Sequence, residues 1–144
     1  MTQQRLMSVV TILAVGGIVV SSISLQHHFA TSKTAYCEIG ENFNCDIVNR
    51  SEYSSILGIP VALIGMLGYG ALTWLATVYR RRQETPAMLL GAAGAGLAFA
   101  LYLTYIEGHV LGVWCILCLS SLTLIGLITM LAAAIWWKPD SGER

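Results

Sequence analysis

The sequence predicts an all-α membrane protein whose helices form a bundle of four transmembrane spans. Of its 144 residues, 56% are hydrophobic and 11% are charged, whereas soluble domains are about 25% charged. Four apolar stretches reach the length of about 20 residues that a helix needs to cross a bilayer. We therefore expect one transmembrane domain over residues 1–144, with spans at about 6–25, 59–79, 86–106 and 113–137 and an outer loop at 26–58.

The basic residues predict the orientation of this bundle. Six of the eight Lys and Arg residues, including the run 80–82, fall on the side of the two termini, and only Lys33 and Arg50 fall on the other. The positive-inside rule then places the termini in the cytoplasm and the loop 26–58 and the turn 107–112 outside. The net charge is zero and no basic block is interleaved with aromatic residues, so nothing suggests nucleic acid as a partner.

Each span has features that fit its place. The first follows Arg5 as a secretory signal would, but its apolar run exceeds the usual stretch of about 7–15 residues and no Ala-x-Ala site follows, so we expect it to be retained. Pro60 fits the start of the second span and Pro86 the first turn of the third. Glycines let membrane helices approach closely, and the second and third spans contain Gly65, Gly68, Gly70, Gly91, Gly94 and Gly96.

The outer loop is expected to contain a short helix. Over residues 46–57, apolar and polar residues alternate in a way compatible with one helix lying on the mouth of the bundle. Asp46 would lie near its N-terminus, where a carboxylate favours the exposed amide groups, and Gly58 to Pro60 would end it. Such a helix would cap the cavity beneath it.

All four cysteines fall on the outer side of this arrangement. Cys37 and Cys45 lie in the outer loop, and Cys115 and Cys118 form a Cys-x-x-Cys pair at the start of the fourth span. Disulfides form outside the cytosol, and electrons pass along a row of dithiols only if each pair can touch the next. Cys115, near a helix N-terminus that favours a thiolate, is the better target for a loop thiolate. Cys118, almost one turn deeper, is placed to pass electrons to a carrier in the lipid.

A quinone fits the role of that carrier, because it is soluble in the membrane and accepts two electrons and two protons, as one dithiol supplies them. Hydrogen-bond donors near its carbonyl oxygens would assist the reaction. The sequence does not rank the candidates for this role, which are Ser51, Tyr53, Ser54, Tyr102, Tyr105 and His109.

Other interpretations of these residues remain open. The Cys-x-x-Cys pair could be two packing cysteines, and Cys37 and Cys45 could form a structural disulfide. All four thiolates together could hold a zinc ion, although an oxidising compartment disfavours this and no metal is expected. Glu107 is interpreted as a solvated residue at a helix end rather than as a proton relay.

The combined pattern closely resembles the vitamin K epoxide reductase family. The resemblance covers nearly the whole chain and depends on Cys37, Cys45, Ser51 and Cys115–Cys118 in this order, with Gly58-Ile59-Pro60 opening the second span. It implies that Cys37 exchanges with a partner protein, that Cys45 attacks Cys115, and that Cys118 interacts with the quinone near Ser51. Leu122 stands where animal members have a Tyr, and the second span lacks their Asn, which argues against epoxide reduction.

The resemblance therefore implies a prokaryotic thiol oxidase of the inner membrane, with its site facing the periplasm. A thioredoxin-like (DsbA-type) protein acting in trans would pass electrons through Cys37/Cys45 to Cys115/Cys118 and on to ubiquinone or menaquinone, which supports disulfide bond formation. The alternatives are a non-enzymatic membrane scaffold with structural disulfides, and a vitamin K epoxide or quinone reductase acting mainly on the quinone. The four-span proteins of the disulfide bond formation protein B type have the two cysteine pairs in the reverse order.

Overall fold

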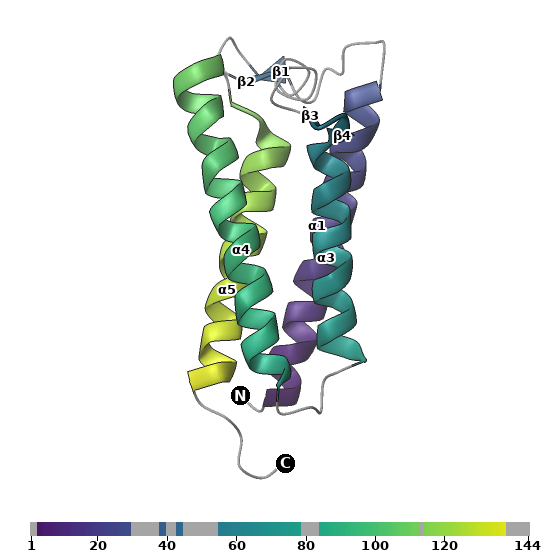
Figure 1. Ribbon diagram of the computed structural model, residues 1–144, viewed down its shortest axis with the longest axis vertical. Helices are drawn as coiled ribbons and strands as arrows, with labels where there is room; N and C mark the ends of the chain where they lie inside the picture. The colour runs from purple at the N-terminus through teal and green to yellow at the C-terminus, as the bar shows by residue number, and fades with distance from the viewer. Residues whose placement is uncertain are drawn as a thin grey trace.

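The computed structural model describes residues 3–29, 38–39, 43–44, 55–78, 84–112 and 114–137. Its long helices run side by side, with the start of α1 and the end of α5 at one end of the bundle and the short strands at the other (Figure 1). A π-helical turn, η3 (Glu107–Leu111), follows α4. The long helices are α1 (Gln3–Phe29), α3 (Val61–Thr77), α4 (Thr85–Ile106) and α5 (Ile116–Trp137).

Three helical segments of the described chain are long and apolar enough to cross a membrane: 4–26, 85–111 and 116–137. The fourth helix, α3, is apolar but has 17 residues, or roughly 25 Å at 1.5 Å per residue. It begins at Val61 because Ile59–Pro60 form a strand instead of the first turn of the expected span. Large apolar side chains such as Ile12, Leu67 and Met130 are exposed on the outside of the bundle, as expected where lipid is the solvent.

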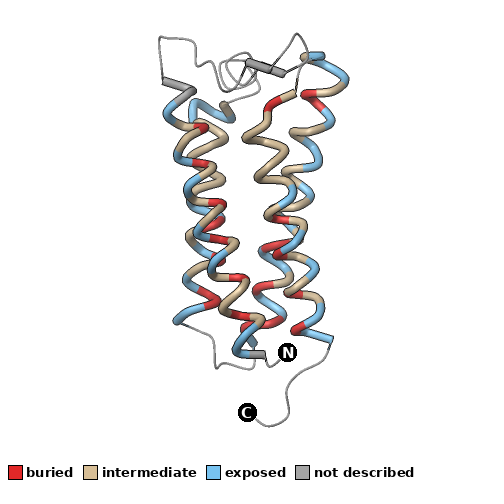
Figure 2. Tube along the Cα trace, turned by 180° about the vertical axis from the view of Figure 1, so that it is seen from behind, coloured by how far each residue is buried: buried red, intermediate tan, exposed pale blue. Residues whose placement is uncertain are grey.

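The tightly packed core fills only one half of the bundle. α1 packs mainly against α3 and α5, and α4 packs mainly against α5. The buried positions gather on the inward faces toward the end with the chain termini (Figure 2). The half near the strands is less filled, and the cavity described below lies there. The core residues are Met7, Val10, Ala14, Tyr69, Leu72, Leu75, Ala76, Leu89, Ala93, Ile125, Ile128, Ala132 and Ile135.

Some of the predicted glycine contacts occur and others do not. A Cβ at Gly65 would lie 2.9 Å from Ser21 Oγ, and one at Gly96 would lie 3.3 Å from Ile125 Cδ1, so helices do approach closely there. The tightest approach is at Gly17 of α1, where the ring of Tyr69 occupies the space that a Cβ would need. The other glycines expected at helix contacts have open space beside them; they are Gly68, Gly70, Gly91 and Gly94.

Two small antiparallel hairpins lie at the end of the bundle opposite the termini. The first pairs β1 (Glu38–Ile39) with β2 (Phe43–Asn44). The second pairs β3 (Ser55–Ile56) with β4 (Ile59–Pro60). Its turn residues, Leu57 and Gly58, have φ angles of 54° and 82°, the two positive values that a tight type I′ hairpin requires.

The second hairpin corrects the expected loop helix at its C-terminal end. Ser55 and Ile56 are extended, and Leu57 has a left-handed conformation that ends regular helix. Gly58 thus belongs to a turn between two strands and does not end a helix. The remaining part of that expected helix, residues 46–54 including Asp46, lies outside the described residues.

The contact between Gly17 and Tyr69 predicts that alanine at position 17 destabilises the protein more than alanine at a glycine with open space beside it. We expect Gly17→Ala to lower the free energy of unfolding by about 1–3 kcal/mol, because a methyl group there overpacks a buried ring. Thermal unfolding in detergent, followed by tryptophan fluorescence, measures the effect. Gly68→Ala, a change into open space, is the matched control. Equal midpoints for the two variants would show that the ring does not constrain α1.

Candidate functional site

The site is built where the chain returns from α4 to α5. The helix widens into the π-turn η3 and ends at Gly112, whose φ of 68° is left-handed. Such π-turns are rare and often occur at functional sites. Gly108 lets Trp114 pack against the turn, since a Cβ there would lie 2.9 Å from Cη2 of the Trp114 ring. This packing brings the next residue, Cys115, back toward the end of α4.

Cys115 sits at the N-terminus of α5. Its carbonyl oxygen accepts the first helical hydrogen bond, from Leu119 N at 2.9 Å. The residue is 0% exposed and packs against Leu111, Ile116 and Leu117. The helix N-terminus carries partial positive charge, which favours a thiolate close to it. Cys115 therefore lies at a helix N-terminus that solvent does not reach.

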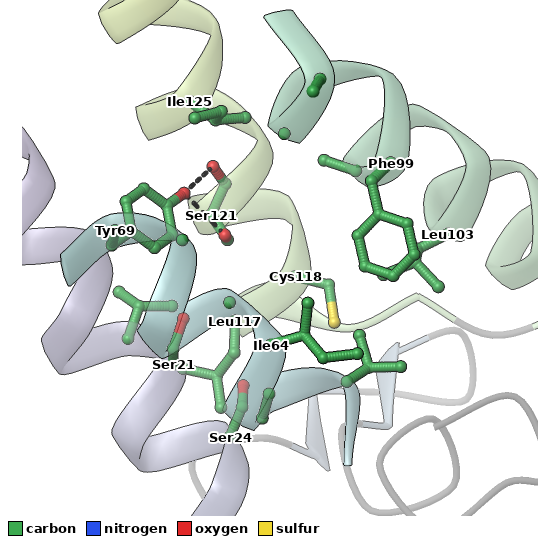
Figure 3. Close-up of a pocket in the computed structure, with 18 of the residues that line it drawn as sticks. Ser21, Ser24, Ile64, Tyr69, Phe99, Leu103, Leu117, Cys118, Ser121 and Ile125 are labelled. Carbon is green, nitrogen blue, oxygen red and sulfur yellow. Dashed lines mark hydrogen bonds between the residues drawn. The ribbon is translucent and has the colours of Figure 1, made fainter. Parts of the chain in front are cut away.

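Cys118 lies in the first turn of the same helix and has a different environment. It is half-buried and contributes to the wall of a cavity of about 370 Å³, to which Cys115 does not contribute. Figure 3 shows the Cys118 side chain pointing from α5 into this space, beside Ile64 of α3 and opposite Phe99 and Leu103 of α4. The two cysteines thus face different surroundings, one sealed and one open to the cavity.

The buried carboxyl group of Glu107 joins the two ends of the turn. Glu107 is 2% exposed, and its Oε2 accepts a hydrogen bond from the Cys115 backbone N–H at 3.1 Å. The Cys118 side chain also hydrogen-bonds to this carboxyl group. The second oxygen, Oε1, is buried and has no hydrogen-bond partner among the described residues. One carboxyl group therefore contacts both members of the Cys-x-x-Cys pair.

The rest of the cavity is mostly apolar and is lined by α1, α3, α4 and α5. Its deep end holds Tyr69, whose hydroxyl donates to the Ser121 carbonyl oxygen at 2.8 Å and shares a second hydrogen bond of 2.8 Å with Ser121 Oγ. Ser21 and Ser24 of α1 face the same space (Figure 3). Protein pockets for small ligands are typically concave and apolar with a few polar groups, and this cavity has that character.

The structure places the predicted site residues in three groups. Cys115 and Cys118 lie together at the start of α5, beside the cavity. Cys37, Cys45 and Ser51 lie outside the described residues, as do Tyr53 and Ser54. The other predicted donors do not line the cavity: Tyr102 and Tyr105 are 55% and 59% exposed, and His109 is exposed and stacks on the Tyr105 ring with centroids 4.4 Å apart.

Sequence reasoning missed the polar residues that the cavity contains. The interpretation of Glu107 as a solvated end residue was wrong, because the π-turn directs its side chain inward. Tyr69, Ser121, Ser21 and Ser24 received no role. The signal that could have found them is the rarity of polar groups within apolar spans, where such residues face the bundle interior.

The chain matches one family of known proteins. Residues 8–133 match the family model described as "Vitamin K epoxide reductase family". The matched range contains the four cysteines, Glu107 and every residue that lines the cavity.

The different exposure of the two cysteines predicts their order of alkylation. In reduced, folded protein we expect N-ethylmaleimide to modify Cys118 about tenfold faster than Cys115, because accessibility limits thiol reactions. Mass spectrometry of peptides taken at successive times measures both rates. Protein unfolded in SDS is the control, in which the difference should largely disappear. Faster modification of Cys115 in the folded protein would contradict the geometry.

Proposed function

The chain belongs to the vitamin K epoxide reductase family, whose members are quinone-linked thiol oxidoreductases, and from this premise we propose that it supports disulfide bond formation. A reduced thioredoxin-like (DsbA-type) protein passes electrons to Cys37 and Cys45. These cysteines reduce the Cys115–Cys118 disulfide by thiol–disulfide exchange. The Cys115/Cys118 pair then reduces a membrane quinone, either ubiquinone or menaquinone.

The observation that carries this proposal is the position of Cys118 in the wall of the cavity. At about 370 Å³ the cavity falls within the range of about 300–1,000 Å³ typical of small-ligand pockets, so it fits a quinone ring with part of its tail. When bound, a quinone accepts two electrons and two protons. Ile64, Phe99 and Leu103 would hold the ring beside Cys118, and we propose from the resemblance that Ser51 contributes a hydrogen bond near it.

The burial of Cys115 supports a relay through the outer loop. A separate folded protein does not reach a residue that is 0% exposed, which favours mediation by a thiol of the chain itself. Glu38 and Asn44, the sequence neighbours of Cys37 and Cys45, are paired in the β1–β2 hairpin. We propose that Cys37 and Cys45, which lie outside the described residues, act together as the dithiol of the loop.

We also propose how the protein lies in its membrane. All four long helices cross the inner membrane as one transmembrane domain. The positive-inside rule then directs the end that carries Cys115 and Cys118 toward the periplasm. Thiol oxidation belongs in that compartment, which quinone coupling keeps oxidising.

Two cysteine variants separate the proposed steps. We expect Cys118→Ala to abolish quinone reduction, because it removes the sulfur beside the cavity. We expect Cys37→Ala to lower the rate with a reduced thioredoxin-like protein by about 100-fold or more while dithiothreitol still supports quinone reduction, since small thiols bypass the loop relay. The measurement is quinone absorbance in detergent with each reductant.

Ser120→Ala is the control for these variants, because Ser120 lies two residues from Cys118 but does not line the cavity. It should retain activity with both reductants. Undiminished quinone reduction by Cys118→Ala would remove the proposed centre. Equal loss with both reductants in Cys37→Ala would contradict the separate role of the outer loop.

Ser51→Ala tests the proposed quinone contact. We expect the KM for quinone to rise and turnover to fall by about tenfold, the effect of losing one hydrogen bond of roughly 1–1.5 kcal/mol. Exchange between the thioredoxin-like protein and the cysteines, followed by thiol trapping without quinone, should stay unchanged. If both steps proceed at the rate of the unmodified protein, Ser51 has no part in quinone binding.

A further inference from the structure

The buried carboxyl group at the end of α4 requires an explanation. Glu107 is the only acidic residue of the sequence between Thr85 and Trp137, and its side chain is 2% exposed. Burying a carboxylate is costly unless its oxygens are hydrogen-bonded. A position that keeps such a group in an apolar bundle is more often functional than structural.

Capping of α5 accounts for only part of this geometry. The hydrogen bond from Cys115 N to Oε2, 3.1 Å long, is the contact that a capping carboxylate makes at a helix N-terminus. It leaves Oε1 buried and without a partner among the described residues. Capping also does not explain why the same carboxyl group hydrogen-bonds to the Cys118 side chain. Glu107 and Cys118 both line the cavity, so the carboxyl group adjoins both the sulfur and the proposed quinone space.

We propose that Glu107 is a catalytic residue that accepts the proton of the Cys118 thiol and delivers it toward the quinone. The inference rests on the proposed function and adds the proton path to it. The S–H bond of Cys118 breaks as an O–H bond forms on Glu107, which leaves a thiolate at the start of α5. Oε2 remains held by the Cys115 amide, so Oε1, to which none of the described residues hydrogen-bonds, is available to carry the proton.

The complete step balances in atoms and electrons. As the Cys115–Cys118 disulfide forms, the two sulfur atoms together lose two electrons, and the quinone gains them. Two protons leave the thiols, one from Cys118 by way of Glu107 and one from Cys115. The products are one disulfide and one hydroquinone. General acid–base catalysis of this kind typically contributes about 10²–10⁴-fold to a rate.

Glu107→Gln isolates proton transfer from the structural contact. The amide oxygen of Gln can still accept the Cys115 N–H, but the side chain cannot accept a proton at neutral pH. We expect turnover with quinone to fall by about 100-fold or more, with little change in the KM for quinone. Glu107→Asp should recover part of the rate. Glu84→Gln, which changes an exposed acid at the other end of the bundle, should retain the full rate.

A second measurement does not use quinone. In Cys115→Ala protein, the rate of Cys118 alkylation by iodoacetamide is followed against pH by mass spectrometry. Two groups that share a proton titrate in coupled steps, so we expect a two-step profile with Glu107 present and a single step after Glu107→Gln. Among the described residues, the other polar side chains that line the cavity carry uncharged hydroxyl groups: Ser21, Ser24, Tyr69 and Ser121. His109 does not line the cavity and stacks on the ring of Tyr105.

The outcomes distinguish this inference from the function on which it rests. Failure of the unmodified protein to reduce any quinone would overturn the proposed function, while the alkylation profile would still test the shared proton. Full turnover in Glu107→Gln, or the same alkylation profile with and without the carboxyl group, would overturn the role of Glu107. If Glu107→Gln does not fold, the profile of Glu107→Asp replaces it: a shifted first step supports the proton path, and an unchanged profile contradicts it.

Discussion

The site depends on one contact, the hydrogen bond between the buried carboxyl group of Glu107 and the backbone N–H of Cys115. It joins the end of α4 to the start of α5 across a turn of π-helix and a left-handed glycine. Because that amide belongs to the residue at the helix N-terminus, the contact fixes where α5 begins. The start of α5 in turn decides which cysteine is sealed and which faces the cavity.

The second constraint is the unequal filling of the bundle. Near the chain termini, large apolar side chains from all four long helices meet in a continuous core. Toward the strands, small residues such as Gly68, Ala92 and Ala95 line the cavity between the helices. Tyr69 lies at the boundary, with its ring against Gly17 and its hydroxyl bonded to Ser121. The packed core and the cavity thus lie in different halves of the bundle.

Much of the helical architecture could be predicted from the sequence, because long apolar runs permit few structures in a bilayer. The structure bears out a mostly helical chain with apolar helices of membrane-spanning length. The expected helix at 46–57 was wrong at Ser55 and Ile56, since the positive φ angles of the following turn depend on local turn chemistry and not on periodicity. The Cys-x-x-Cys pair was apparent from its spacing, but the burial of Glu107 was not. Which way a side chain points at a helix end depends on a π-turn and on packing by Trp114, and neither has a sequence signature of its own.

In the proposed function, Cys115 and Cys118 alone pass two electrons to a quinone held in the cavity. The most direct test uses a Cys37→Ala/Cys45→Ala variant, fully reduced and mixed without oxygen with one equivalent of quinone. We expect one hydroquinone and one Cys115–Cys118 disulfide per protein molecule, detected by absorbance and by mass spectrometry. Quinone that stays oxidised while both thiols stay reduced and the protein stays folded would contradict it.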